Sequence, residues 1–251
     1  AWDAYRRLVS SYGEVVAGLP ASLFEAEIDR VTQGQDERLL DFSQLRQLTR
    51  SFLGLYETHA GRPFPQDARE QLSGAIEAVF ASWNADKAVQ YRRIHQIDHD
   101  MGTAVILQRM VFGNTGGHSG AGVGFTRDPG TGEPRLWVDF LANAQGEDVV
   151  SGRRNAHGHA TLAAVAPDAW KQLQASAQAL EQHFGDMQDF EFTVQDGVLH
   201  MLQTRSAKRT PLAAARIALD LLDEGLIDSA EALHRTQAID AAALGTVRMV
   251  A

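Results

Sequence analysis

The sequence contains no cysteine, and this absence excludes several kinds of chemistry at once. Without thiols the chain cannot form disulfides, use a cysteine nucleophile or bind zinc through thiolates. No apolar run approaches the roughly 20 residues that cross a bilayer, and no signal-peptide pattern opens the chain. We therefore expect a cytoplasmic protein without a membrane partner.

Positive charge is also scarce. The 23 Lys and Arg residues face 32 Asp and Glu residues, which gives a formal net charge of -9 at pH 7. This balance disfavours a general binder of nucleic acid or of anionic membranes, although it is compatible with a local basic pocket. The hydrophobic share of 44% and the charged share of 22% are ordinary for a folded globular protein. A chain of 251 residues is long enough for one large domain or two small ones.

The first hundred residues are predicted to be helical, because their apolar positions recur at helical spacing. Four long helices are expected at 2–19, 23–31, 45–56 and 68–83, and a short fifth at about 91–94. The chain starts at Ala1, inside the first of these amphipathic stretches, as an excised fragment would.

The pattern changes to strands after about residue 100. Strands are expected at 104–112, 122–127, 135–141, 190–194 and 198–203, and helices at 166–184, 212–222 and 229–234. Asp196-Gly197 is typical of a tight hairpin turn. The sequence therefore predicts an α+β protein, with an all-helical subdomain over 1–100 and a mixed unit with antiparallel hairpins over 101–251.

The densest motif is the glycine-rich segment 113–124, which holds six glycines between two predicted strands. Glycine lets a ligand approach the backbone closely, so such a loop can offer N–H groups to phosphates. The segment lacks the Gly-Lys-Ser/Thr of a Walker A motif, and a strand rather than a helix follows it. A plain, flexible hairpin connection is the alternative that this motif leaves open.

A second motif lies on the predicted hairpin. Asp189 and Glu191 are two residues apart, so their carboxylates share one face of a strand. Gln203 and Arg205 repeat this spacing on the partner strand, and cross-strand placement would bring Arg205 near the acidic pair. Two carboxylates suit Mg²⁺, and an arginine suits a polyphosphate. The alternative is a solvated polar face of a two-stranded ribbon.

Three further polar segments carry weaker signals. The segment 143–148, which ends in Glu147 and Asp148, is equally compatible with a nucleotide site and a plain turn. The histidines and aspartates at 95–100 favour an exposed loop that binds no metal, and so do His157 and His159. Arg6 and Arg7 are expected to be solvated unless another part of the protein brings phosphate to them.

Taken together and in order, these segments resemble the nucleotide-binding, ATP-grasp part of the pyruvate phosphate dikinase family. The resemblance is carried by residues 2–7, 80–84, 91–93, 110–114, 119–127, 143–150, 186–193 and 201–210. It implies that residues 101–251 form one ATP-grasp-like lobe, an ATP-binding half-site with C-terminal helices. Enzymes of this family use ATP to phosphorylate a histidine on a separate swivelling domain, which releases AMP, while phosphate becomes pyrophosphate. The phosphohistidine then converts pyruvate to phosphoenolpyruvate.

The resemblance also implies roles for particular residues. It implies Arg205 as the catalytic residue, and Asp189 and Glu191 as ligands of Mg²⁺. It implies that ATP is contacted by Arg7, Gln108, Met110, Asp148, Asp189, Glu191, Gln203 and Arg205, with Gln108 and Met110 on a strand beside the adenine.

The sequence departs from the family pattern in several places. It lacks the family's first ATP-grasp subdomain with its essential lysine, the phosphohistidine motif and the C-terminal barrel, so the missing parts are implied partners. His118 and the segment 155–159 replace the family's usual residues in two loops. We expect the chain alone to be inactive. The alternatives are a standalone, non-catalytic protein that binds nucleotide or another subunit, and one component of a two-chain enzyme.

Overall fold

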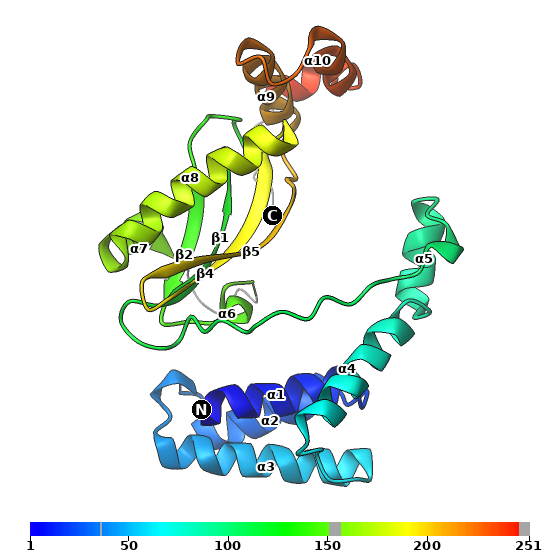
Figure 1. Ribbon diagram of the computed structural model, residues 1–251, viewed down its shortest axis with the longest axis vertical. Helices are drawn as coiled ribbons and strands as arrows, with labels where there is room; N and C mark the ends of the chain where they lie inside the picture. Colours follow the sequence, from blue (N-terminus) through cyan, green and yellow to red (C-terminus); the bar gives the residue numbers. More distant parts are fainter. Residues whose placement is uncertain (36, 151–156, 246–251) are drawn as a thin grey trace. The chain divides into compact units, whose positions relative to one another are not determined.

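The computed structural model describes residues 1–35, 37–150 and 157–245 (Figure 1). The chain divides into two compact units between Gln108 and Arg109, whereas the sequence pattern places the division near residue 100. We call residues 1–108 the helical unit and residues 109–251 the sheet unit.

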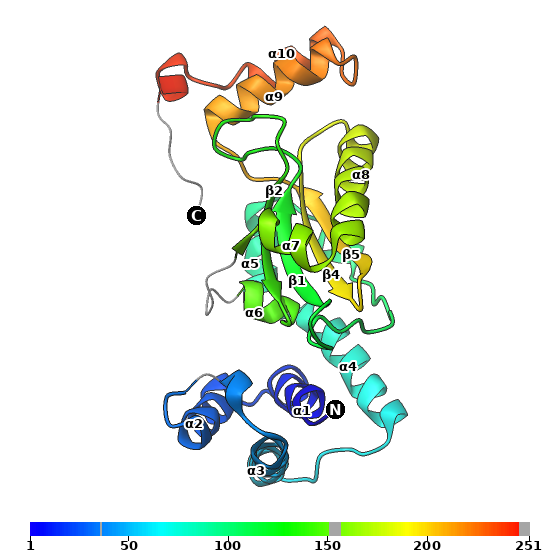
Figure 2. The same cartoon turned by 90° about the vertical axis from the view of Figure 1, so that its left-hand side faces the viewer.

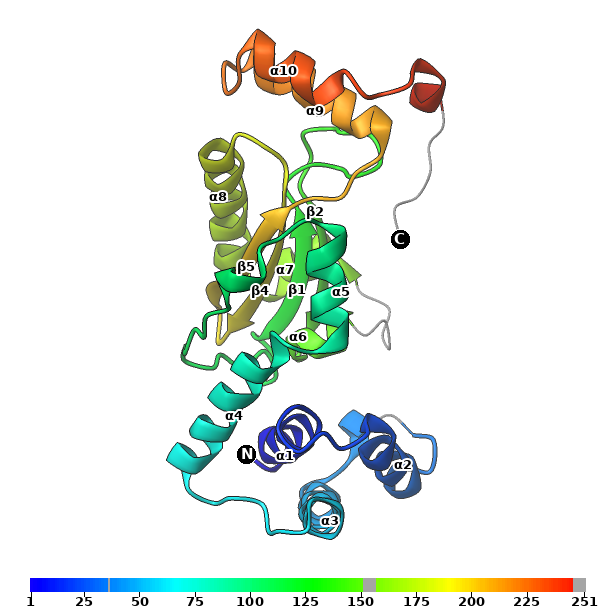
Figure 3. The ribbon, with the colours of Figure 1, turned by 90° about the vertical axis from the view of Figure 1, so that its right-hand side faces the viewer.

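The helical unit is built around three long helices. These are α1 (Trp2–Val15), α2 (Ala21–Thr32) and α3 (Phe42–Ala60), with α1 and α3 seen almost end-on in Figure 3. Their shared core includes Phe24, Leu48, Phe52 and Tyr56, each at most 2% exposed. Burial of these side chains is the main force that holds the three helices together.

The rest of the helical unit is less buried. It contains α4 (Ala68–Ser82), α5 (Asp86–Ile94) and two single turns, Glu37–Leu39 and His99–Met101. The guanidinium of Arg92 lies 3.8 Å from the ring centre of Trp83, and Arg92 Nε donates to His99 Nδ1 at 3.3 Å. Trp83 Nε1 donates to the His99 carbonyl at 3.1 Å. His99 therefore joins α4 to α5.

The sheet unit contains one antiparallel sheet in the order β3-β2-β1-β4-β5. Its strands are β1 (Gly120–Phe125), β2 (Trp137–Ala142), β3 (His157–Gly158), β4 (Gln188–Gln195) and β5 (Val198–Ser206). Its helices are α6 (Gly146–Val150), α7 (His159–Val165), α8 (Pro167–Phe184), α9 (Pro211–Asp223) and α10 (Ser229–Thr236), and Ala241–Gly245 forms a 3₁₀ turn. The structure confirms the α+β class. None of the helices in the described residues is long and apolar enough to cross a membrane.

Helices α7 and α8 cover one face of this sheet (Figure 2). The buried rings of Phe140, Phe190 and Phe192 point to that side, opposite three glycines of β1. A Cβ atom at Gly122 would overlap the Phe192 ring and lie 2.7 Å from the Asp139 carbonyl oxygen. The glycines of β1 thus make room for aromatic side chains from both neighbouring strands.

Successive strand residues point to opposite faces, so the residues between these aromatics form the second face of the sheet. It carries Val123 on β1, Asp139 on β2, Asp189 and Glu191 on β4, and Gln203 and Arg205 on β5. We call this surface the polar face.

The strand predicted at 104–112 is wrong. In the structure this segment has neither helix nor strand, and Ile106, Leu107 and Met110 are 86%, 74% and 58% exposed. Its apolar residues have strand propensity, but a strand also needs a hydrogen-bonded neighbour, and within the described residues the segment has none.

Two short helices were missed by the sequence patterns. Helices α6 and α7 have five and seven residues, which is too short to show a helical period. The first helix also ends earlier than predicted, at Val15, because Gly18 adopts a left-handed conformation with φ of 67° before Pro20.

Candidate functional site

The β4–β5 hairpin brings the four predicted residues together on the polar face. Asp189 lies directly opposite Arg205, and Glu191 lies opposite Gln203. The Asp196-Gly197 turn sets this register, and a bulge at Leu202 follows the Glu191–Gln203 pair. The cross-strand placement predicted from spacing is therefore confirmed.

Asp189 and Arg205 form an ion pair. Arg205 Nε donates to Asp189 Oδ2 at 2.7 Å, while the Arg205 side chain stays 64% exposed and that of Asp189 is 14% exposed. The hydrogen bond and charge of Asp189, with a smaller contribution from Glu191, raise the pKa of Arg205. Neither Nη group of Arg205 makes a hydrogen bond to the described residues. Arg205 is thus oriented through Nε and keeps two donors for a ligand.

Glu191 and Gln203 are available in a similar way. In the described parts of the chain, neither side chain has a hydrogen bond or ion pair. The half-buried Glu191 carboxylate and the exposed Gln203 amide thus offer oxygen atoms beside the Asp189–Arg205 pair.

These residues fit Mg²⁺ only together with a ligand. Mg²⁺ is usually held by one or two carboxylates plus substrate phosphates rather than by a complete protein cage. In the part of the chain that the structure describes, no three His, Asp or Glu side chains are grouped to hold a metal ion. The pair Asp189 and Glu191 matches the first of these arrangements, in which two carboxylates hold the metal and substrate phosphates complete its coordination.

Asp139 is a third carboxylate on the polar face, and the sequence analysis missed it. It lies on β2, in register with Val123 of β1 and Gly158 of β3. Burial raises the pKa of its carboxyl group, and nothing among the described residues donates to it or pairs with it. The alternation of Trp137-Val138-Asp139-Phe140 was a signal that could have placed Asp139 on the face opposite the buried Val138 and Phe140, but not beside a particular strand.

The glycine-rich segment serves largely as a packed connection. A Cβ atom at Gly113 would overlap the Ala144 carbonyl and lie 2.7 Å from the Gly120 carbonyl. Ser119 Oγ is 2.6 Å from Thr115 Oγ1 and accepts the Asp196 N–H at 2.9 Å. These contacts fasten the segment to the β4–β5 turn and favour the structural interpretation of its glycines.

The side chain of Asp148 accepts a hydrogen bond from the backbone three residues earlier. Its side chain is at the start of α6, where Oδ2 accepts the Gln145 N–H at 2.9 Å, and the residue is 9% exposed. Gln145 Nε2 in turn donates to Asn114 Oδ1 at 3.2 Å. This geometry gives Asp148 a capping role, while its contact with nucleotide stays a prediction.

Three other predicted ligands belong to other segments than the hairpin. Gln108 and Met110 are exposed and lie on the irregular segment described above, so their expected place on a strand is wrong. Arg7 belongs to α1 in the helical unit, where it pairs with Asp3 at 3.0 Å and Glu37 at 3.5 Å. Arg7 is therefore neutralised by carboxylates rather than simply solvated.

Two of the three histidines whose roles the sequence left open, His118 and His159, have structural contacts. His118 Nδ1 lies 3.0 Å from the Val165 carbonyl oxygen. His159 starts α7 and stacks on Trp170 with ring centres 5.4 Å apart, so it does not lie in a loop as expected. His157 lies in β3, while Asn155 and Ala156 lie outside the described residues.

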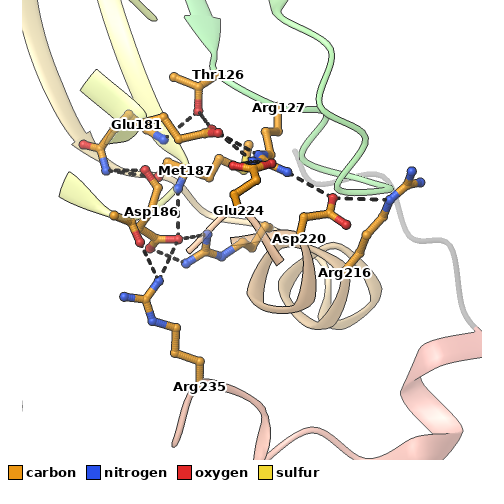
Figure 4. A network of polar contacts seen from close by, with 12 residues as sticks. Thr126, Arg127, Glu181, Asp186, Met187, Arg216, Asp220, Glu224 and Arg235 are labelled. Atoms are coloured by element: carbon orange, nitrogen blue, oxygen red, sulfur yellow. Dashed lines mark hydrogen bonds and ion pairs between the residues drawn. The ribbon is translucent and has the colours of Figure 1, made fainter. Parts of the chain in front are cut away.

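Figure 4 shows a network of ion pairs around the buried Arg127 that the sequence did not reveal. Arg127, 1% exposed, follows β1 and reaches Glu181 of α8 at 2.8 Å. It also reaches Asp220 of α9 at 3.0 Å and Glu224, just after α9, at 2.9 Å. Burial would lower the pKa of Arg127, but its bonds to Glu181 and Glu224 raise it overall. The network joins β1, α8 and α9.

An antiparallel sheet with an arginine, an amide and carboxylates aligned on one face has the chemistry expected of a protein that binds a polyanion. Comparison with known families makes this class specific. The family described as "Pyruvate phosphate dikinase, AMP/ATP-binding domain" matches residues 43–164 and 159–225. The chain therefore belongs to the pyruvate phosphate dikinase family, as its sequence motifs indicate.

Curated relatives agree with this assignment. The chain is 46% identical over 242 residues to pyruvate, phosphate dikinase of Clostridium symbiosum, which covers 95% of the chain and 28% of the relative. It is 45% identical over 240 residues to the chloroplastic enzyme of Flaveria trinervia, covering 94% of the chain and 25% of the relative. For the Rhizobium meliloti (strain 1021) enzyme the identity is 44% over 260 residues, 97% of the chain and 28% of the relative. The chain thus spans only about a quarter of these proteins.

Proposed function

We propose that the polar face binds ATP as its Mg²⁺ complex. The observation that carries this proposal is the register of the β4–β5 hairpin, which aligns Asp189 with Arg205 and Glu191 with Gln203 on one face. The match to an AMP/ATP-binding domain supports nucleotide as the ligand.

Arg205 is the residue that contacts phosphate in this proposal. Its Nε is fixed by Asp189, so the guanidinium plane is oriented before the ligand arrives. Its two Nη groups can then donate to phosphate oxygens as charge-assisted hydrogen bonds. Such positioned positive charge is the main protein contribution to phosphoryl transfer, because charge builds up on the phosphate oxygens.

Asp189 and Glu191 would hold Mg²⁺, with the Gln203 amide oxygen beside them. When bound, the metal supplies charge neutralisation between the carboxylates and the phosphates. The roles proposed for Arg7, Gln108, Met110 and Asp148 at the nucleotide rest on the family resemblance alone.

For the whole protein we propose the activity that the relatives' name states. The sheet unit would act as one lobe of an ATP-grasp fold within a pyruvate phosphate dikinase. Its partners would be the remaining ATP-grasp subdomain and the phosphohistidine domain, and this chain alone would not turn over. The cytoplasmic location expected from the sequence remains a prediction.

Calorimetric titration of the chain with Mg·ATP tests the binding proposal. We expect measurable binding that Arg205→Ala weakens at least tenfold, as expected for a lost charge-assisted hydrogen bond. Arg135→Ala is the matched control, because Arg135 has a 69% exposed side chain and also pairs with an aspartate, Asp128. Absence of binding, or equal affinities for the two variants, would overturn the proposal.

Turnover distinguishes the proposed enzyme part from a standalone binding protein. The wild-type chain should release AMP from ATP only when the missing subdomains are supplied as separate chains. If the chain binds nucleotide tightly but releases no AMP even when those subdomains are present, the non-catalytic alternative is favoured.

A further inference from the structure

We infer that Asp139 extends the nucleotide-binding surface to β2 and accepts hydrogen bonds from the ribose hydroxyls of the bound nucleotide. This inference rests on the proposed function, and Asp139 lies on β2 rather than on the β4–β5 hairpin.

The sheet register places Asp139 in one row with the proposed site. Asp139 lies opposite Val123, Val123 lies opposite Glu191, and Glu191 lies opposite Gln203. Adjacent strands are about 4.8 Å apart, so the row from β2 to β5 spans about 14 Å. Arg205 lies in the neighbouring row, opposite Asp189 and two residues beyond Gln203 on β5. A nucleotide with its phosphates between Arg205 and Glu191 would extend toward β2 across the uncharged side chain of Val123.

No other polar side chain of the row lies on the β2 side of Glu191. On β3 the position opposite Asp139 is Gly158, and among the described residues a Cβ atom there would meet nothing closer than the Val138 carbonyl oxygen at 3.8 Å. Asp139 therefore ends the row as a half-buried carboxylate with open space beside it, and no described residue donates to it.

Of the phosphates, the ribose and the base of a nucleotide, the ribose is the best partner for a carboxylate. A carboxylate repels phosphates, and it accepts hydrogen bonds but does not donate them. The ribose presents two neighbouring hydroxyl donors to it, and acidic side chains bind ribose hydroxyls in this way in other folds. The ribose is also the part next to the phosphates, hence the part that reaches β2 first.

Nucleotide analogues that lack one hydroxyl test this inference directly. The full chain, Asp139→Ala and Asp139→Asn are titrated with the Mg²⁺ complexes of ATP, 2′-deoxy-ATP and 3′-deoxy-ATP. We expect the wild-type chain to bind at least one deoxy analogue about tenfold more weakly than ATP, and Asp139→Ala to bind all three ligands equally. Asp139→Asn keeps the side-chain size and should retain only part of the discrimination.

Asp168→Ala is the matched control, because Asp168 lies on α8 and its side chain is 82% exposed. It should discriminate between the ligands as the wild-type chain does. The ribose contact is overturned if Asp139→Ala still discriminates between ATP and the deoxy analogues, or if it loses affinity for all three ligands equally. In either case a weaker binding of Mg·ATP by Arg205→Ala would still support the nucleotide site. If the wild-type chain binds none of the ligands, both proposals fail.

Discussion

At the scale of single residues, Arg127 and Arg205 show two uses of the same side chain. Arg127 is 1% exposed, and all of its bonds go to carboxylates of the protein. Arg205 is largely exposed, and among the residues that the structure describes only its Nε is engaged. A buried, fully paired arginine holds elements together, whereas an oriented and exposed arginine can receive an anion.

Replacing Arg127 by Met should destabilise the protein strongly. Three carboxylates would lose their shared partner, and the largely buried Glu181 would keep a charge without it. Breaking a buried ion pair in this way typically costs about 3–5 kcal/mol. Urea unfolding at neutral pH would measure this loss. Lys171→Ala is the control, since the pair of Lys171 with Asp168 is 75% and 82% exposed and should contribute no more than about 1 kcal/mol. Similar losses for the two variants would contradict the role of the buried network.

The residue scale also shows how far sequence reasoning reaches into the site. Spacing and a two-residue turn determine the hairpin register, so the sequence was enough to bring together Asp189, Glu191, Gln203 and Arg205. The sequence was not enough to add Asp139 to this group, since its neighbours in the row come from strands whose order the sequence does not state. Local pairing is readable from the chain, but the order of strands across the sheet depends on tertiary packing.

At the scale of elements, β1 is a central strand in which half of the residues are glycine. Its Gly120, Gly122 and Gly124 lie under aromatic rings of β2 and β4. The predicted strand at 104–112 has the opposite combination, with high strand propensity and no hydrogen-bonded neighbour in the described residues. In both cases the available partners, rather than intrinsic propensity, decide whether a strand forms.

Substitution of Gly122 by Ala should therefore destabilise the sheet unit. The added methyl group would collide with the Phe192 ring and the Asp139 carbonyl, and overpacking of this kind costs about 1–3 kcal/mol. Gly117→Ala is the matched control, because a Cβ atom there meets no atom within 4 Å. Thermal unfolding of both variants checks the prediction. A Gly122→Ala protein as stable as the control would show that the rings do not pack as described.

At the scale of the whole molecule, the chain carries separate hydrophobic cores. One core lies among α1, α2 and α3, one between the sheet and α7–α8, and a small third one around Met187 and α9. The division at Gln108 and Arg109 assigns the first core to the helical unit and the other two to the sheet unit. Each unit thus has its own source of stability.

Phe52→Ala should loosen the helical unit selectively. Phe52 is fully buried, and removal of a buried phenylalanine ring costs about 3–5 kcal/mol. Hydrogen exchange followed residue by residue should show faster exchange in α1–α3 and unchanged protection in β1, β2, β4 and β5. A uniform increase along the chain would mean that the two units unfold as one cooperative body.

The glycines of β1 also bear on the order of folding events. A strand with so little intrinsic preference for the extended state loses much conformational entropy when it is fixed. We expect it to become ordered only after β2 and β4 have brought their phenylalanine rings into place. The central strand of the sheet would then be among the last to form, and substitutions at its glycines would accelerate unfolding more than they slow folding.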